Sequence, residues 1–233
     1  SFVYKPPTEW IPPDSFPTER LCQATEIAID LETKDPNLKE LGPGYIRGDG
    51  EVVGISFAID GYEDYFPFAH EQGFNFSKKK VLEFTKKICA TNSDKIFHNS
   101  TYDVGWLTKE GVTINGRIID TMIVAPLIDE NQYWYSLNAL GREYINEGKT
   151  EAELNAAAEE WGLDPKAEMW RLPSAYVGTY ATQDAALTLK LWNHFKILLE
   201  EQNLWNVFDL EMRVLPVILA MKQKGVRVDL DKA

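Results

Sequence analysis

One segment near the end of the chain restricts the fold more than any other. Between residues 174 and 201, side chains recur at helical spacing and form one largely apolar stripe, while polar side chains lie on the opposite face. This pattern predicts a long helix that packs against a core. The stripe consists of Val177, Tyr180, Ala181, Asp184, Thr188, Leu191, Phe195, Leu198 and Leu199, and the opposite face carries Gln183, Lys190, Asn193 and Glu200. A carboxylate, Asp184, therefore lies in the middle of the face that must be buried.

The buried position of Asp184 has two interpretations. An ionised carboxylate on an apolar face is costly unless it is paired or bound to a metal. The same face offers Tyr180 one turn earlier but no Lys or Arg. Asp184 is then either part of a functional site or a core polar residue whose partner comes from another segment. A second Tyr-x-x-x-Asp pair, Tyr45 and Asp49, falls in a glycine-rich loop where no helix fixes its spacing, and we discount it.

The remaining segments alternate between the period of strands and the period of helices. Together they predict an α/β fold, with a central sheet flanked by helices. Strands are expected over residues 26–32, 52–59, 62–68 and 95–97, with a hairpin turn at 60–61 and a loop over 36–50. Helices are expected after Ser77, which caps the first, and over residues 100–110, 121–128, 136–145, 151–161, 174–201 and 205–224. Residues 1–20 are rich in proline and are expected to form an extended arm.

Composition and charge exclude several classes of protein. Apolar residues make up 44% of the chain and charged residues 26%, which is typical of a globular protein. The formal charge of −12 means that the general surface should bind a phosphate backbone poorly, so any nucleic-acid site must be local. The lysines at 78–80 and 86–87 are interpreted as a solvated helix face. Cys22 and Cys89 lack zinc or disulfide spacing, which favours a reducing compartment. No membrane span or secretory signal is visible in the sequence.

The pair Asp30 and Glu32 is the first cluster with chemical meaning. In a strand, residues i and i+2 emerge on one face, roughly 6.5–7 Å apart, so both carboxylates point to one side beside the small Ala28. Two acids that face one point repel each other, and a divalent cation between them would remove that repulsion. The alternative is a solvated strand end. Asp209 and Glu211 have the same spacing inside a helical stretch and serve as an internal decoy.

A second cluster follows the short strand at 95–97. Asp103 lies on the same side of the following helix as Trp106 and Leu107, so we expect it to point inward at the carboxyl end of a strand. Ligand sites in open α/β sheets occur at such ends. Asn99 or Ser100 is expected to cap this helix. The three histidines, His70, His98 and His194, have no Ser or Cys at a recognisable spacing, so acyl transfer is not supported.

In chain order, these clusters read Asp-x-Glu at 30–32, Asn-x-x-x-Asp at 99–103 and Tyr-x-x-x-Asp at 180–184. The combination resembles the three exonuclease motifs of the DEDD superfamily in its tyrosine subclass, because Thr179 stands where the sister subclass has a histidine. From about residue 26 to 233 the chain looks similar to the 3′→5′ proofreading domain of family A DNA polymerases of bacteria and phages. The resemblance extends to sequence around the motifs, which includes Phe97-His98-Asn99, Ile119-Asp120-Thr121-Met122 and residues 135–140. The resemblance implies a ribonuclease H-like fold with a mixed central sheet.

The resemblance also implies a mechanism and a set of site residues. Two divalent ions, Mg²⁺ with Mn²⁺ or Zn²⁺ as alternatives, would assist hydrolysis of the terminal phosphodiester of single-stranded or frayed DNA 3′ ends, releasing nucleoside monophosphates. Asp30, Glu32 and Asp184 would hold one ion, and Asp30 with Asp103 the other. Tyr180, a neutral phenol, would orient the attacking water. The substrate contacts implied are Thr33, His98, Asn99 and Tyr102. The aromatic residues Phe97, Trp106, Trp134 and Trp170 could stack bases, although core packing is the preferred interpretation for each.

The resemblance finally sets expectations about domains and partners. Residues 21–203 would form the exonuclease domain, and residues 204–233 a helix and the start of a junction to the polymerase domain of the parent chain, of which this chain would be an excised or separate portion. We expect a monomer without membrane association, in the cytoplasm of a bacterium or a phage-infected cell. Two alternatives stay open. A ribonuclease D-like RNA exonuclease is disfavoured by the tail at 225–229, and a catalytically silent structural brace is disfavoured because all four acids are present.

Overall fold

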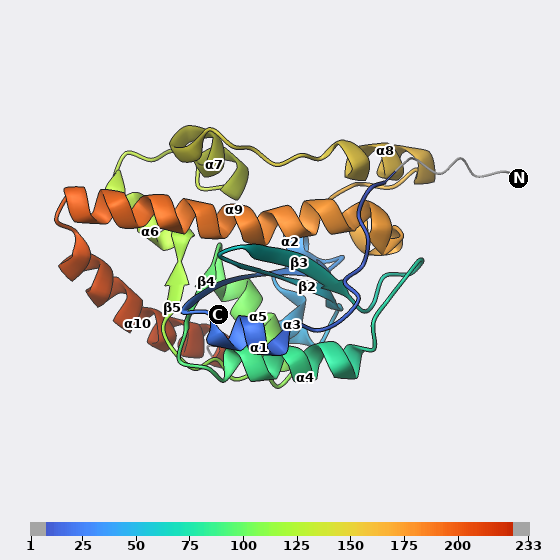
Figure 1. Cartoon of the computed structure of the whole chain (residues 1–233), viewed down its shortest axis with the longest axis horizontal. Coiled ribbons are helices and arrows are strands. Elements are labelled where there is room, and N and C mark those ends of the chain that lie inside the picture. Colours follow the sequence, from blue (N-terminus) through green and yellow to red (C-terminus); the bar gives the residue numbers. More distant parts are fainter. Residues whose placement is uncertain (1–7, 226–233) are drawn as a thin grey trace, which may run out of the picture.

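A mixed five-stranded sheet forms the centre of the computed structural model, which describes residues 8–225 (Figure 1). The strand order is β3-β2-β1-β4-β5. The hairpin partners β1–β2 and β2–β3 are antiparallel, whereas β1–β4 and β4–β5 are parallel. The strands are β1 (Glu26–Lys34), β2 (Glu51–Ile59), β3 (Tyr62–Pro67), β4 (Asp94–Phe97) and β5 (Ile118–Asp120). The expected α/β class and mixed sheet are confirmed, and β5 is a strand that the sequence analysis did not predict.

The helices agree with the sequence pattern in every long element. The longer ones are α4 (Lys78–Cys89), α5 (Ser100–Lys109), α6 (Thr121–Ile128), α7 (Leu137–Ile145), α8 (Ala152–Trp161), α9 (Ser174–Glu201) and α10 (Trp205–Lys224). The shorter ones are α1 (Thr18–Gln23), α2 (Leu38–Leu41), α3 (Gly44–Arg47) and the 3₁₀ turn Met169–Arg171. The prediction of a plain loop over 36–50 was wrong, because α2 and α3 lie within it. The proline-rich arm ends where α1 begins, and its residues 1–7, like 226–233 of the expected junction, lie outside the described residues.

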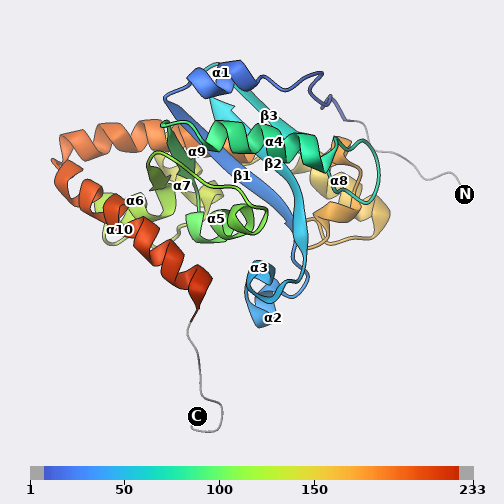
Figure 2. The ribbon, with the colours of Figure 1, turned by 90° about the horizontal axis from the view of Figure 1, so that it is seen from below.

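The helices form layers on both faces of the sheet. Helix α9 crosses one face and contacts β1, β2, β3 and β4, and α7 and α8 lie on its outer side (Figure 1). Helix α4 covers the opposite face, in front of the strands in the view from below (Figure 2), where Phe84 packs against Phe57 of β2 with ring centroids 5.4 Å apart. Helix α10 packs against α5, α6 and β5. As a result, α9 is sandwiched between the sheet and an outer layer.

Alternation along β1 divides its side chains between these two layers. Ile27, Ile29 and Leu31 are buried in the main core, while Asp30 and Glu32 emerge on the other face, toward α9. The opposing positions on β2 are small, since Asp30 pairs with Ser56 and Glu32 with Gly54. A Cβ at Gly54 would lie 2.2 Å from the hydroxyl of Tyr65, so only glycine leaves room for that ring. The sheet thus presents two acids to α9 with little bulk beside them.

Capping of the helices was predicted correctly in one case and wrongly in another. Ser77 accepts a hydrogen bond from the amide of Lys80 at the start of α4, as expected. The α5 cap is different, because Asn99 has a positive φ of 73° and its side chain makes no capping bond. The carboxylate of Asp120 accepts from the backbone amides of Asn99 and Ser100 instead, at 3.0 and 2.7 Å. A residue distant in sequence therefore replaces the local cap.

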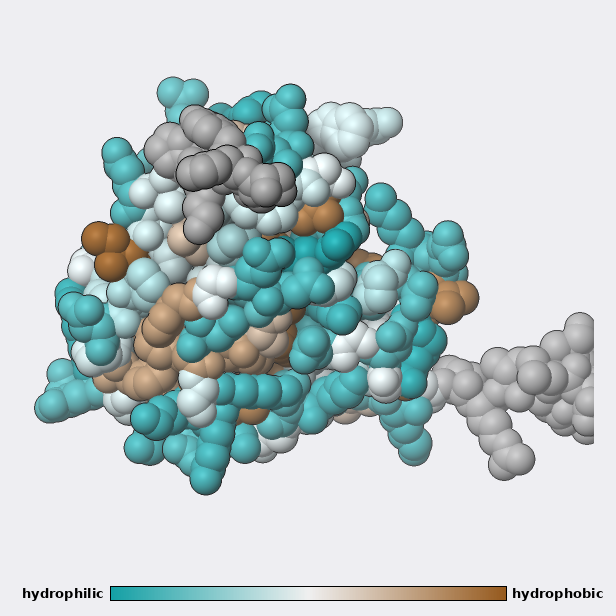
Figure 3. All heavy atoms as spheres, turned by 90° about the vertical axis from the view of Figure 1, so that its right-hand side faces the viewer, coloured by the Kyte–Doolittle hydropathy of each residue, from teal (hydrophilic) through white to brown (hydrophobic). Residues whose placement is uncertain are grey.

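The surface agrees with the charge of the chain. The end of the molecule that carries α8 is mostly hydrophilic, with a light-brown apolar area in its lower part (Figure 3). The lysines of α4 at 78–80 are exposed, as the interpretation of a solvated helix face requires. Within residues 8–225, each helix is too short or too polar to traverse a lipid bilayer.

Candidate active site

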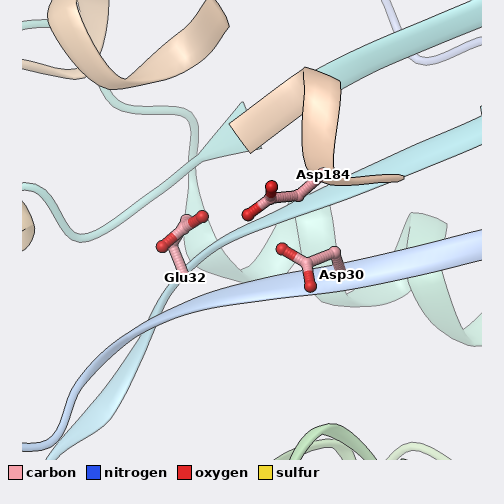
Figure 4. Close-up of side chains that lie close together, drawn as sticks. All are labelled: Asp30, Glu32 and Asp184. Carbon is pink, nitrogen blue, oxygen red and sulfur yellow. The ribbon is translucent and has the colours of Figure 1, made fainter. Parts of the chain in front are cut away.

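Three of the four predicted acids meet in one place. Asp30 and Glu32 project from β1, and Asp184 projects toward them from α9 (Figure 4). One carboxylate oxygen from each lies within 4.8 Å of the others. Helical spacing places Tyr180 and Asp184 on the same face of α9, the face that packs on the sheet. Segments more than 150 positions apart in the sequence are therefore joined by the packing of one helix on one strand.

The fourth acid, Asp103, lies beside this trio and not within it. It occupies the first turn of α5 and is only 4% exposed. Its Oδ2 atom is buried and has no hydrogen-bond partner among residues 8–225. Burial raises its pKa well above the ordinary value, and the charges of Asp30, Asp120, Glu32 and Asp184 raise it further. The inward orientation expected for Asp103 is confirmed, and the carboxylate is near enough to the trio to feel its field.

The clustered acids resist ionisation. Burial raises the pKa of Asp30 well above its usual range, and the neighbouring charge of Asp184 adds to the effect. The pKa of Glu32 is raised by burial and then by Asp30 and Asp184. Burial also raises the pKa of Asp184, against the opposing effect of the Lys149 ammonium. Removal of these carboxylates from water, together with their mutual repulsion, means that the ionised cluster needs positive charge nearby.

That positive charge is partly supplied by Lys149, which the sequence analysis missed. Its Nζ atom lies 2.8 Å from Oδ1 of Asp184 and donates to the Tyr180 hydroxyl at 3.2 Å. The Lys149 side chain is 15% exposed and that of Asp184 is 8% exposed, so the ion pair is largely shielded from solvent. Burial lowers the pKa of Lys149, but the charges of Asp184, Tyr180 and Asp30 outweigh it and raise the pKa above the ordinary value. Asp184 is thus both part of an acidic cluster and the partner of a cation from another segment.

The loop that carries Lys149 is fixed by side chains of the neighbouring helices. Its backbone amide donates to Oδ1 of Asn138 on α7 at 2.9 Å. Gln183 of α9 binds both sides of it, donating to the carbonyl of Gly148 at 3.1 Å and accepting from the amide of Thr150 at 2.6 Å. Gln183 directly precedes Asp184, so one turn of α9 holds both the loop and the carboxylate. The polar face of α9 binds this loop and is not simply solvated.

Tyr180 lies against the same cluster. Its side chain is buried, at 8% exposure. Burial raises its pKa above the usual value, and the charges of Asp184 and Glu32 raise it further, against the smaller effect of Lys149. A raised pKa keeps the phenol neutral at any physiological pH. The Tyr180 hydroxyl accordingly carries its proton.

A hydrogen-bonded chain lies at the end of β1, next to the acids. The Tyr102 hydroxyl donates to Oδ2 of Asp35 at 3.0 Å and lies 2.8 Å from Oγ1 of Thr33. The amide of Gly44 also donates to Oδ2 of Asp35, at 3.0 Å. Thr33, Asp35 and Tyr102 line a cavity of about 340 Å³, together with Lys39 and Lys166. Thr33 and Tyr102, two of the four expected substrate contacts, therefore face an open space near the end of β1, although none of the four acids lines it.

The other two expected substrate contacts, His98 and Asn99, differ in how accessible their side chains are. The ring of His98 lies 2.7 Å from Oγ1 of Thr121 through Nδ1 and 2.7 Å from the carbonyl of Tyr135 through Nε2. Both ring nitrogens are thus engaged within the protein, which favours a structural role for His98. Asn99 is exposed, and its side chain is free of a capping duty.

Of the aromatic residues considered for base stacking, two belong to the core. Phe97 and Trp106 are completely buried. Trp134 is 66% exposed, and the Nζ of Lys34 lies 4.2 Å from the centroid of a Trp170 ring. The core interpretation is therefore confirmed for the first pair, while Trp134 is accessible to a ligand.

A buried, hydrogen-bonded Tyr–His pair lies near Asp30 and Glu32. The Tyr65 hydroxyl lies 2.8 Å from Nε2 of His70, and Nδ1 of His70 lies 3.0 Å from the carbonyl of Leu172. Burial lowers the pKa of His70 to about 4, so this ring is neutral. The pKa of Tyr65 is raised by burial and then by Glu32 and Asp30. No short sequence pattern indicates this pair, because neither residue lies within one of the three motifs.

Comparison with known proteins identifies the family of the chain. Residues 17–200 match the model of the 3′–5′ exonuclease domain of family A DNA polymerases. A DNA-directed DNA polymerase of Pseudomonas phage M6 is 37% identical over 230 residues, covering 97% of this chain and 35% of the relative. The DNA polymerase DpoZ of Salmonella phage PMBT28 is 30% identical over 218 residues, covering 90% of this chain and 32% of the relative. The chain thus spans about a third of the length of these curated relatives.

Solved structures share the fold at lower identity. They include the POL domain of Pol1 from M. smegmatis, in complex with DNA primer-template and dNTP (TM-score 0.64, 15% identity, covering 91% of this chain and 31% of that one). Brucella melitensis NrnC with bound Mg²⁺ has a TM-score of 0.63 at 19% identity, covering 92% of this chain and 93% of that one. Escherichia coli RNase D has a TM-score of 0.60 at 15% identity, covering 90% and 48%. The fold is the ribonuclease H-like exonuclease fold. The extent of the family match, together with the phage polymerases that share 30–37% of its residues, shows that this chain belongs to the 3′–5′ exonuclease domain family of family A DNA polymerases.

Proposed function

We propose that this chain is a metal-dependent 3′→5′ exodeoxyribonuclease, the proofreading part of a DNA polymerase. It would hydrolyse the terminal phosphodiester of single-stranded or frayed DNA 3′ ends and release nucleoside monophosphates. The observation that carries the proposal is the convergence of Asp30, Glu32 and Asp184 within 4.8 Å. Such a group of acids, withdrawn from water, is unfavourable in itself and suits a divalent cation.

The donor set fits divalent metal ions of the hard type. Every candidate ligand is a carboxylate oxygen, the type that Mg²⁺ and Mn²⁺ prefer. Asp103 adds a buried oxygen without a hydrogen-bond partner among the described residues, and this oxygen is a further candidate metal ligand. Asp30, Glu32 and Asp184 would hold one ion, and Asp30 with Asp103 a second. When bound, such ions supply Lewis acidity and balance the charge that develops on the phosphate.

The residues of the chain would then position the reactants. Tyr180, whose raised pKa keeps it neutral, would hold the attacking water through its hydroxyl group and would not remove its proton. Lys149 adds positive charge beside Asp184. This local charge matters because the chain as a whole carries −12 and repels a phosphate backbone elsewhere.

The cavity near the end of β1, where Thr33 directly follows Glu32 in the chain, is the proposed site of the terminal nucleotide. It is lined by Thr33 and Tyr102, which offer hydroxyl groups, and by the lysines Lys39 and Lys166. Its volume of about 340 Å³ is of the size that a single nucleotide fills. A frayed single strand suits this site, because an acidic body cannot grip a duplex by its general surface. DNA is preferred to RNA as the substrate because the most similar relatives reported above are DNA polymerases.

The polymerase portion of a longer chain is the proposed partner. Helix α10 buries Phe208, Met212, Leu215 and Leu219 against the domain, yet it also exposes a second apolar stripe. That stripe consists of Val207, Leu210, Val214, Val217, Ile218 and Met221, which are 39–66% exposed. A helix that is apolar on two faces is normally covered on both. Because α10 follows the family match and the relatives are about three times longer, the polymerase portion would cover this stripe.

A double substitution tests the proposal. The Asp30→Ala plus Glu32→Ala variant should abolish magnesium-dependent digestion of a single-stranded DNA oligonucleotide. The matched control is Asp209→Ala plus Glu211→Ala. It removes an Asp-x-Glu pair from α10, away from the clustered acids, and should leave digestion unchanged. Matched DNA and RNA oligonucleotides in the same assay separate the proposed activity from that of a ribonuclease. Unchanged digestion by the first variant would contradict the proposed mechanism.

A further inference from the structure

Lys149 is the one cation in contact with both Asp184 and Tyr180 among residues 8–225, and it lies outside the three exonuclease motifs. Its ammonium group is 2.8 Å from Oδ1 of Asp184 and 3.2 Å from the Tyr180 hydroxyl. Three hydrogen bonds between the backbone of its loop and the side chains of Asn138 and Gln183 hold the loop in place. A long lysine side chain loses conformational entropy when it is fixed in this way. The interactions that Lys149 makes must offset that cost.

The direction of the hydrogen bond limits what Tyr180 can do. An ammonium group has three donors and no acceptor, so Tyr180 must accept from Lys149. A phenol has a single proton, and this proton is then directed away from Lys149. The ring face of Tyr180 also lies near the cation, with Nζ 5.0 Å from the ring centroid. Lys149 therefore fixes both the place of the Tyr180 ring and the direction in which its hydroxyl donates.

The charge of Lys149 has a separate consequence. Its ammonium lies 2.8 Å from Oδ1 of Asp184, whose carboxylate lies within 4.8 Å of those of Asp30 and Glu32. A divalent ion held by the same acids would experience its repulsion. If the Lys149 charge weakens metal binding by some factor, then removal of that charge should strengthen metal binding by the same factor.

We propose that Lys149 is a positioning residue that acts as a tethered cation: it orients Tyr180 and neutralises part of the acidic cluster, and it does so at the expense of metal affinity. The inference rests on the proposed function, since it assumes that the acids bind divalent ions. It differs from a purely structural role in one respect. A structural lysine would weaken the metal site when removed, whereas a tethered cation would strengthen it.

The test is the metal affinity of Lys149→Met, measured by Mn²⁺ titration with electron paramagnetic resonance. We expect at least tenfold tighter Mn²⁺ binding, about 1.4 kcal/mol, together with at least a tenfold lower kcat on a single-stranded oligonucleotide. Addition of Mg²⁺ should also raise the Tm of this variant by more than it raises the Tm of the unsubstituted protein. Lys190→Met is the matched control, because Lys190 pairs with Glu147 on the surface at 2.9 Å with 55% exposure. It should change none of these quantities.

Two further variants keep the inference falsifiable. Lys149→Gln removes the charge but retains a donor for Tyr180, so it should bind Mn²⁺ as tightly as Lys149→Met and lose less kcat. In the Lys149→Met plus Tyr180→Phe double variant, the loss of kcat should be about that of Tyr180→Phe alone, since both changes disturb one hydroxyl. Unchanged or weaker Mn²⁺ binding by both Lys149 variants would overturn the inference. That outcome is distinct from failure of the proposed function, which the Asp30 and Glu32 variant tests directly.

Discussion

Asp120 is a single buried carboxylate that stabilises the start of two helices. It is 3% exposed and accepts four hydrogen bonds. Three come from Asn99 and Ser100 at the start of α5, with lengths of 3.0, 2.7 and 2.6 Å, and one from the amide of Met122 in α6, at 2.9 Å. A hydrogen bond to a charged group contributes about 1.5–3 kcal/mol, and a buried amide left unpaired costs about as much.

The Asp120→Asn substitution keeps one acceptor oxygen and replaces the other with an NH₂ group. An NH₂ group cannot accept hydrogen bonds from the backbone amides that Asp120 binds. With about half of the bonds lost, the free energy of unfolding should fall by roughly 3–5 kcal/mol, a third or more of the typical stability of about 5–15 kcal/mol. For a chain of this size that corresponds to a Tm lower by roughly 6–20 °C.

Urea denaturation followed by circular dichroism measures this loss directly. Asp164→Asn is the matched control, because Asp164 is exposed and accepts two backbone bonds, from Lys166 and Ala167 at 2.9 and 2.8 Å. We expect it to cost less than about 1 kcal/mol, as exposed surface substitutions usually do. A loss below about 1 kcal/mol for Asp120→Asn would refute the reasoning that one carboxylate holds both helix starts together.

Three other predictions concern the site and the surface. Because burial raises the pKa values of the clustered acids above their unfolded values of about 4, the folded protein without metal binds more protons than the unfolded chain. Its stability in EDTA should therefore fall as the pH rises above about 4, and saturating Mg²⁺ should abolish that fall, as thermal unfolding would show. Tyr180→Phe should slow hydrolysis at least tenfold while leaving the Mn²⁺ affinity within about threefold, and loss of metal binding would mean that the tyrosine is misplaced. Leu210→Glu on the exposed stripe of α10 should leave the Tm of this chain within about 2 °C but weaken its association with the polymerase portion, measured by titration of the separate parts.

The positions of the acids could be predicted because they depend on local periodicity. Alternation in β1 alone places Asp30 and Glu32 on one face, and the helical stripe alone places Asp184 on the buried face of α9. Neither pattern says that these two faces meet. That step came from the resemblance to a known family, and the contacts between α9 and β1 bear it out.

The parts that sequence reasoning missed depend on contacts between distant segments. Lys149 lies in a loop without periodicity, and only the packing of α7 over α9 brings it to Asp184. Strand β5 has three residues, Ile118–Asp120, which is too short for an alternating pattern. The cap of α5 was assigned to its own neighbours, whereas the carboxylate of Asp120 arrives from the adjacent parallel strand. In each case the deciding partner is more than ten positions away in the chain.

The distribution of charge bears on how so acidic a chain would carry out the proposed reaction on DNA. A net charge of −12 disfavours binding of a DNA duplex by the general surface. Asp103 and Asp184 are buried and Asp30 and Glu32 partly buried, and burial strengthens electrostatic interactions. Lys149 already places one positive charge there, and bound divalent ions would add more, so the local potential at the acids would become favourable for a phosphate. An exonuclease built in this way would select a free strand end, because only an end can bring its phosphate into one narrow pocket while the rest of the strand stays clear of the acidic surface.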